Sequence, residues 1–208
     1  MRSSDIKREE NYCEFLRLSQ DDNYVDVTYD ENSGGVSAIH KLHKFDKQQG
    51  VCGMRRGDYE RVVVNILRKT GYRIILESEA YPSVGVKVCD GLLDDMAMEI
   101  KTIEGNGTWS VSTKLRAAVE QHASCVVLYF PEDEHYSPQR IVDGIRLAES
   151  SPNGRLTNLT RLLIVVGEHL ITDWDKKATP IEGWSIREGL RRQNGADPFT
   201  ISPSDTKV

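Results

Sequence analysis

The chain has 208 residues, of which 27 are Lys or Arg and 32 are Asp or Glu, giving a formal net charge of −5 and a pI near 5.6. With 38 % hydrophobic and 28 % charged residues, the composition is that of an ordinary globular protein, and the length fits one domain with at most a small appendage. No apolar run approaches the roughly 18 residues of a membrane span, and the first residues lack the apolar segment of a secretory signal. The four cysteines lie far apart and form no C-x-x-C pair, which argues against a zinc ribbon, a redox motif or a disulfide-dense scaffold. The composition therefore favours a reduced, cytosolic type of fold without a membrane span.

Charge is unevenly distributed along the chain. Residues 36–76 hold nine basic and three acidic side chains, whereas residues 77–104 hold seven acidic and two basic ones. A basic segment beside an acidic one could hold a phosphate backbone next to a divalent cation. Chance unevenness on a solvated surface is the simpler interpretation, and the charge pattern alone favours it.

In chain order, the first fifty residues are expected to form a small N-terminal appendage. A short helix is expected over 11–18, and the alternation of residues 24–29 predicts a strand. Turn residues follow at 30–35, and residues 36–39 could return as the second strand of a hairpin. Residues 40–51 are polar and basic and are interpreted as the linker into the main domain.

The main domain is expected over residues 51–196, followed by a loose tail over 197–208. It begins with a helix that ends before Gly71 and whose apolar face comprises Tyr59, Val62, Val63, Ile66 and Leu67. The further predicted elements are strands over 72–76, 84–89 and 96–103, a helix over 112–123, a strand over 125–130, a helix over 140–149, a strand over 162–166 and a short helix over 186–193. Residues 91–95 are the expected turn between the second and third strands, which would make these two strands a hairpin. The order α-β-β-β-α-β-α-β predicts an α/β fold with a mixed central sheet flanked by helices.

The third predicted strand carries an acidic residue and a lysine two positions apart. Glu99 and Lys101 are therefore expected to point to one face of the sheet, whereas Met98 and Ile100 point to the other. Inside an apolar strand an unpaired charge is costly unless a partner or a metal ion compensates it. The expected hairpin brings Asp90 towards this pair, so that two carboxylates and one ammonium group converge at one end of the sheet. The alternative interpretation is a structural cross-strand ion pair.

This combination fits a site for a hard divalent cation, Mg²⁺ or Mn²⁺, which takes carboxylate oxygens, water and substrate phosphate as ligands. Such an ion lowers the pKa of bound water and polarises a phosphodiester, while a lysine stabilises the negative charge that develops. Asp90 and Glu99 are the first expected ligands. Glu60, beside the apolar face of its helix, could add a third carboxylate, although the default for a helical glutamate is simple exposure to solvent.

Together these residues resemble the PD-(D/E)xK nuclease superfamily. The resemblance covers residues 57–130, and the α-β-β-β-α-β order there is that of the superfamily's restriction-endonuclease-like core. The matching residues are Glu60 in the first helix, Asp90 and Glu99-x-Lys101 on the hairpin, and Gln121 in the next helix ahead of an apolar strand. The resemblance implies that all five are catalytic, and that Asp90, Glu99 and Glu60 bind the metal ion.

The details resemble most the branch that contains the C-terminal nuclease domains of contact-dependent growth inhibition toxins. The segments that carry this likeness are 71–72, 87–90, 98–102 and 120–121. Several members of that branch cleave transfer RNA, so the resemblance implies RNA in preference to DNA and a cognate immunity protein as a partner. It also implies action in the cytoplasm, after delivery into a target cell as part of a larger toxin. The chain departs from the pattern at Cys89, which stands where the superfamily's name has proline.

A nuclease with a net negative charge still has to hold a polyanion, and the most concentrated positive segment precedes the helix that carries Glu60. The expected nucleic-acid contacts are Lys41, Lys44, Arg55, Arg56 and, further along the chain, Lys114. We expect them to track the phosphate backbone without reading sequence. The alternatives are a solvated linker that touches nothing and, for Lys114, a solvated lysine near a helix start.

Three further residues allow two interpretations each. Trp109 follows Gly105-Asn106-Gly107-Thr108 and either stacks on a base or anchors the core. His40 and His43 could line a nucleic-acid path, but the polar linker is the simpler interpretation, because no Cys or acidic neighbours stand at metal-ligand spacing.

The leading hypothesis from the sequence is a metal-dependent endonuclease that hydrolyses RNA, transfer RNA above all, as a bacterial toxin-type nuclease. The alternatives are a DNA repair or restriction-type nuclease, and a non-catalytic nucleic-acid-binding or assembly module on a nuclease-like core. The joint presence of Asp90, Glu99 and Lys101 favours an enzyme, because a degenerate core would tolerate their loss.

Overall fold

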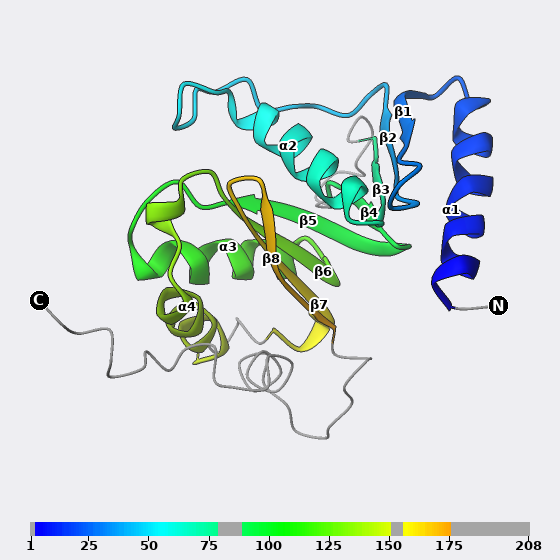
Figure 1. Cartoon of the computed structure of the whole chain (residues 1–208). Coiled ribbons are helices and arrows are strands. Elements are labelled where there is room, and N and C mark those ends of the chain that lie inside the picture. The colour runs from blue at the N-terminus through cyan, green and yellow to red at the C-terminus, as the bar shows by residue number, and fades with distance from the viewer. Residues whose placement is uncertain (1–2, 79–88, 151–155, 176–208) are drawn as a thin grey trace, which may run out of the picture.

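Eight strands, counted among the residues that the structure describes, lie side by side in one mixed sheet and follow one another in sequence order (Figure 1). This computed structural model describes residues 3–78, 89–150 and 156–175. The strands are β1 (Tyr24–Tyr29), β2 (Val36–His40), β3 (Arg73–Leu76), β4 (Gly91–Leu93), β5 (Met96–Thr102), β6 (Cys125–Phe130), β7 (Arg161–Val166) and β8 (His169–Asp175). The helices are α1 (Ser3–Ser19), α2 (Arg56–Lys69), α3 (Thr108–Glu120) and α4 (Pro138–Ser150), with short 3₁₀ turns at Asp133–His135 and Leu156–Asn158. The pairs β2–β3, β5–β6 and β6–β7 are parallel and the other neighbours are antiparallel, so the expected α/β class with a mixed sheet is confirmed.

Helices cover both faces of this sheet (Figure 1). α2 packs on one face through a cluster that includes Tyr59, Val63 and Leu67, all fully buried, as the apolar periodicity of this helix predicts. α3 and α4 pack on the opposite face. α1 also lies opposite α2, at the far end of the sheet, where Leu18 contacts β2 and β3.

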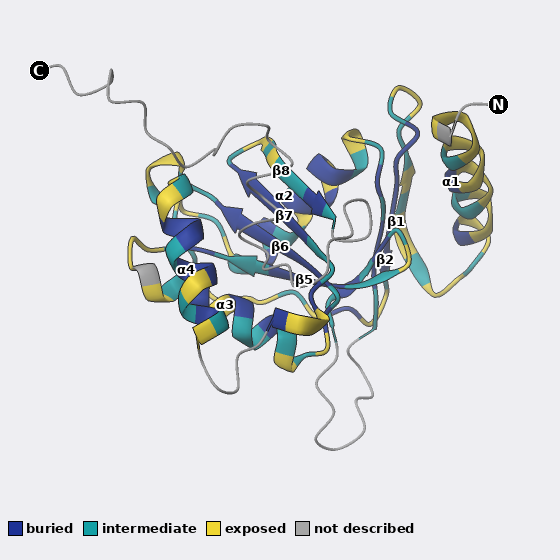
Figure 2. Cartoon of the chain, turned by 90° about the horizontal axis from the view of Figure 1, so that it is seen from below, coloured by how far each residue is buried: buried dark blue, intermediate teal, exposed yellow. Residues whose placement is uncertain are grey.

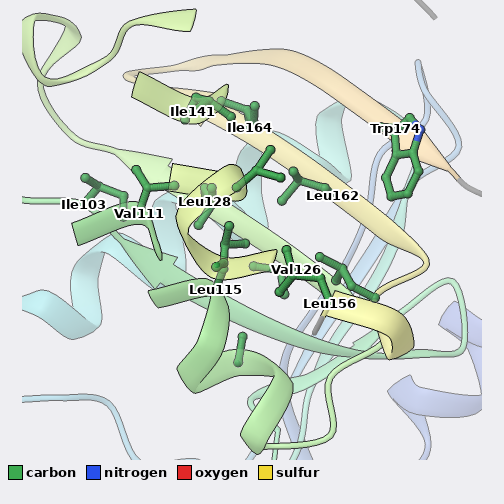
Figure 3. Packing of buried hydrophobic residues seen from close by; sticks show 14 of the residues in the cluster. Ile103, Val111, Leu115, Val126, Leu128, Ile141, Leu156, Leu162, Ile164 and Trp174 are labelled. Carbon is green, nitrogen blue, oxygen red and sulfur yellow. The ribbon is translucent and has the colours of Figure 1, made fainter. Parts of the chain in front are cut away.

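The largest part of the core lies between the central strands and the pair α3–α4. Val126 and Leu128 of β6 pack with Leu162 of β7, Leu115 of α3 and Ile141 of α4 (Figure 3). Every residue of β6 is buried (Figure 2). This burial is the reason for the fully apolar sequence of the strand, since β6 has a parallel neighbour on each side and helices above and below.

The N-terminal hairpin expected from the sequence forms, because β1 and β2 pair antiparallel. β2 then pairs in parallel with β3, with Ile39 opposite Leu76, so residues 24–40 extend the main sheet. α1 begins at Ser3, well before the expected start at residue 11. Its first half is mostly exposed, so no apolar period marks it as a helix in the sequence.

The hairpin of β4 and β5 has a shorter turn than expected. Strand β4 occupies Gly91–Leu93, which the sequence interpretation wrongly assigned to the turn; the strand expected over 84–89 lies outside the described residues except for its last residue. Asp94 and Asp95 form a two-residue turn with φ of 46° and 67°, a conformation that Asp tolerates better than most residues. A Cβ at position 91 would lie 2.0 Å from the carbonyl oxygen of Ile75, so glycine is what lets β4 pair with β3.

Two further differences from the expected elements concern a helix start and a strand. α3 begins at Thr108 rather than at 112. β8 was not expected at all. β8 is an edge strand that buries only Trp174 fully, so its polar sequence hides the strand period. The helix expected over 186–193 and the tail from 197 lie outside the described residues. None of the helices in the described ranges is long and apolar enough to span a membrane.

Candidate active site

Asp90 and Glu99 face each other across the β4–β5 hairpin. β4 pairs with β5 so that Gly91 stands opposite Met98, and continuing this antiparallel register by one residue sets Asp90 opposite Glu99. The Asp90 amide donates to Glu99 Oε2 at 3.1 Å, and the Ile100 amide donates to Asp90 Oδ2 at 2.7 Å. Each carboxylate is thus held by a backbone amide of the opposite side of the hairpin.

Lys101 joins this pair from the same face of β5. Its Nζ forms an ion pair with Glu99 Oε1 and donates to Gln121 Oε1 at 2.9 Å. Gln121 caps the C-terminus of α3, and its side chain also hydrogen-bonds Glu99. Met98 and Ile100 are buried on the opposite face, against α2, so the alternation predicted for this strand is confirmed.

Burial puts the two carboxylates in an unfavourable electrostatic environment. Glu99 is only 1 % exposed. Desolvation, followed by the charge of Glu99, raises the pKa of Asp90 to about 8, against the lowering effects of the Ile100 amide and Lys101. Desolvation also raises the pKa of Glu99, although the charge and hydrogen bond of Lys101 favour its ionised form. One lysine does not compensate the buried carboxylate of Glu99 and the half-buried carboxylate of Asp90, so the site favours uptake of a further cation or a proton.

Cys89 links the beginning of the hairpin to the end of α3. Its thiol donates to the backbone oxygen of Gln121 at 3.0 Å. Burial, together with the charges of Glu99 and Asp90, raises the pKa of the Cys89 thiol to about 11. The thiol therefore stays protonated at neutral pH, which suits a packing role and not that of a nucleophile.

Glu60 is held by a buried histidine from the segment before α2. The side chain of His43 is fully buried, with Nε2 3.0 Å from Glu60 Oε2 and Nδ1 2.9 Å from the backbone oxygen of Glu77. Because a carbonyl oxygen only accepts, Nδ1 carries a hydrogen and donates to Glu77. The charge of Glu60 also contributes to the raised pKa of Asp90, so Glu60 lies within electrostatic reach of the carboxylate pair while one of its oxygens is engaged by His43.

Sequence reasoning missed this role of His43, which it interpreted as part of a polar linker. The ring packs edge-on against Phe45, with 4.8 Å between ring centroids. The only signal in the sequence was an aromatic residue, Phe45, near His43 in an otherwise basic segment. This signal is too weak to reveal that His43 contacts Glu60, seventeen positions away.

The donor set at the hairpin fits a divalent cation that shares its coordination with substrate. Asp90 and Glu99 offer two carboxylates, and Asp90 Oδ1 accepts no hydrogen bond from the described residues. In the described ranges no group of three or more His, Cys, Asp or Glu side chains is arranged to hold a metal ion. Mg²⁺ commonly binds through one or two carboxylates and completes its shell with water and substrate phosphate, so this site matches that mode and does not match an all-protein cage.

Three of the expected nucleic-acid contacts, Lys41, Lys44 and Arg55, are exposed. Lys44 and Arg55 line a cavity of about 700 Å³ between the segment that precedes α2 and the first turns of that helix. The other charged residues around this cavity are Lys47, Arg61, Asp46 and Asp58, and the ring of His43 also lines it. Its lining is therefore mixed in sign, with basic side chains in excess.

Arg56 and Lys114 lie in different surroundings. Arg56 binds Glu104, with Nη2 2.6 Å and Nε 2.9 Å from Oε2, and so ties the start of α2 to the segment after β5. Lys114 is exposed on α3. Desolvation and then the charges of Lys101 and Arg56 hold the pKa of Lys114 below its usual value, against the opposing effect of Glu104. Lys114 therefore lies within electrostatic reach of Lys101 and Arg56.

The structure thus brings Asp90, Glu99, Lys101 and Gln121 into contact, with Glu60 within electrostatic reach of Asp90. No protein-family model, no curated protein and no solved structure matches this chain. A function for this chain therefore has to be argued from the chemistry of the site and from the residues that carry the sequence resemblance.

Proposed function

We propose that this chain is a metal-dependent endonuclease that hydrolyses nucleic-acid phosphodiesters, with RNA preferred, and that α2 to β6 form its PD-(D/E)xK-like core. The observation that carries the proposal is the direct contact of Asp90, Glu99, Lys101 and Gln121. A structural ion pair needs one acid and one base, whereas here a second, half-buried carboxylate raises the electrostatic cost. Residues with such perturbed pKa values, gathered at one point, are typical of a functional site.

Each residue has a definite part in this chemistry. A Mg²⁺ or Mn²⁺ ion held by Asp90 and Glu99 would supply a bound water of lowered pKa and polarise the phosphodiester. The Lys101 ammonium is placed to stabilise negative charge that develops on the phosphate. Gln121 holds Lys101 Nζ, which keeps the ammonium preorganised. Glu60, oriented by His43, adds negative charge beside Asp90.

The preference for RNA, and for transfer RNA in particular, rests on the sequence resemblance to toxin nuclease domains. The same resemblance supports three further parts of the proposal: a cognate immunity protein as partner, delivery into a target cell within a larger toxin, and action in the cytoplasm.

The test is cleavage by the purified full chain of end-labelled transfer RNA, single-stranded RNA, single-stranded DNA and duplex DNA, in Mg²⁺, in Mn²⁺ and in EDTA. We expect RNA cleavage in either metal and none in EDTA. Glu99→Gln should abolish cleavage with little loss of fold, because it removes a ligand charge from a crowded pair. The matched control is Asp95→Asn, an exposed acid in the turn of the same hairpin, which should keep full activity.

The other outcomes separate the alternatives. Cleavage confined to duplex DNA would support the DNA repair or restriction-type nuclease. Binding of nucleic acid without cleavage in any metal would support the non-catalytic module. Full activity of Glu99→Gln, or cleavage that persists in EDTA, would show that this site is not the catalytic one.

A further inference from the structure

Trp109 is the most exposed large hydrophobic residue in the described part of the chain. It is 66 % exposed, whereas the next such residue, Ile171, is 48 % exposed. The alternative that Trp109 anchors the core is therefore wrong. Among the described residues no aromatic or cation–π contact covers the exposed part of this ring. The exposed indole therefore offers a flat apolar surface on which a ligand can stack.

Arg140 holds the backbone of the segment before Trp109, and the space next to the two glycines of this segment is open. The buried guanidinium of Arg140 donates to the backbone oxygens of Gly105 and Gly107 and, at 2.7 Å, to Ser110 Oγ. On the outer side, a Cβ added at Gly105 or Gly107 would meet no atom within 4 Å. Arg140 thus holds the chain on both sides of Trp109, which limits the backbone entropy lost when a flat ligand stacks on the indole.

α3 connects this tryptophan to the candidate active site. Trp109 lies in the first turn of α3, and Gln121, which binds Lys101, caps the other end. Lys114 is about 7 Å along the helix axis from Trp109 and about 10 Å from Gln121. Because Lys114 and Gln121 are seven residues apart, they lie on the same side of α3. Trp109 and Lys114 are five residues apart, so they lie about 140° from each other around the helix. A nucleic-acid strand that contacts both has to cross the exposed face of α3 before it reaches the Lys101–Glu99 cluster.

We propose that Trp109 stacks on an unpaired base of the substrate strand, whose phosphates pass Lys114 on their way to Lys101. This inference rests on the proposed nuclease function and adds the substrate class: single-stranded or looped nucleic acid. An indole stacks on any base whose face is free, whereas the bases inside a duplex are already stacked on their neighbours. The cationic neighbours of the path favour a polyanion over a protein partner.

The test measures binding in EDTA, so that it does not depend on turnover. The dissociation constants of the full-length wild type and its variants are measured by anisotropy with fluorescein-labelled single-stranded RNA, single-stranded DNA and a closed duplex without free ends. Trp109→Ala should weaken single-strand binding by roughly tenfold and leave duplex binding unchanged. Trp109→Phe should restore most of the loss. Tyr12→Ala, an exposed aromatic residue on α1, is the matched control and should bind like the wild type.

A second arm removes the base instead of the tryptophan. A single strand with abasic positions keeps its phosphates, so the wild type should bind it as weakly as Trp109→Ala binds the intact strand. The inference is overturned if Trp109→Ala binds single strands like the wild type, or loses duplex and single-strand binding equally. A third outcome is that Trp109→Ala selectively loses single-strand binding while the wild type cleaves no substrate. This result would support the stacking site and refute the nuclease proposal.

Discussion

Replacing Asp90 with Asn should stabilise the metal-free protein at neutral and alkaline pH. The native state raises the pKa of Asp90 to about 8, from an ordinary value of 3.8. Between these two values the unfolded state binds fewer protons than the native state, so the free energy of unfolding falls as the pH rises. The favourable contribution is complete below about pH 4 and is lost as the pH rises through 8. Asp90→Asn has no proton to exchange and should lack this dependence.

The magnitude follows from the size of the shift. One pKa unit corresponds to about 1.4 kcal/mol, so at pH 7 the ionisable group costs at most about 4 kcal/mol. Asn keeps an acceptor for the Ile100 amide, but its NH₂ group needs an acceptor of its own, which offsets part of the gain. We therefore expect a net stabilisation of about 2 kcal/mol at pH 7, or roughly 4–8 °C in Tm for a chain of this size, and little difference near pH 4.

Thermal and urea unfolding of both proteins from pH 4 to 9, in EDTA and with Mn²⁺, measures this effect. Mn²⁺ should stabilise the wild type, by about 2.7 kcal/mol at a concentration of 100 Kd, and should stabilise Asp90→Asn much less, because one of the two carboxylates is missing. Parallel stability–pH curves for the two proteins would refute the electrostatic reasoning. Equal stabilisation of both by Mn²⁺ would show that the ion binds elsewhere.

Gly91→Ala should lower the free energy of unfolding, measured in urea, by about 3 kcal/mol or more, since the new Cβ would lie 2.0 Å from a carbonyl oxygen of β3. Gly105→Ala is the control: nothing lies within 4 Å of a Cβ at this position, so the free energy of unfolding should change little. His43→Ala should destabilise the protein by about 2–4 kcal/mol, because it removes a buried ring and leaves its two partners unpaired. His43→Gln retains a donor and should recover part of that loss; equal stability of His43→Ala and wild type would contradict the buried pair. Arg55→Ala should flatten the dependence of log Kd on log salt by about 0.7 for a single-stranded substrate, and an unchanged slope would show that the substrate avoids the start of α2.

Much of the fold was predictable because its signals are local. The stripe on α2 and the apolar run of β6 depend on residues a few positions apart, and both were found. The turn of the hairpin was misplaced because Gly91 and Leu93 fit either a turn or a short strand. Asp94 and Asp95 adopt positive φ, and this conformation cannot be read from residue type alone. β8 escaped notice because an exposed edge strand has little apolar content to reveal its period.

Which side chains share a face of β5 follows from the amino-acid sequence alone, because alternation along a strand requires no tertiary information. The alternation therefore predicts that Glu99 and Lys101 lie on the same face of β5, whatever residues contact them there. Three features depend on how the chain packs in three dimensions: Gln121 binds Lys101, Glu104 binds Arg56, and Trp109 stays outside the core. These outcomes depend on strand register and helix packing, which bring together residues 20 and 48 positions apart, and no local pattern in the sequence encodes such distances.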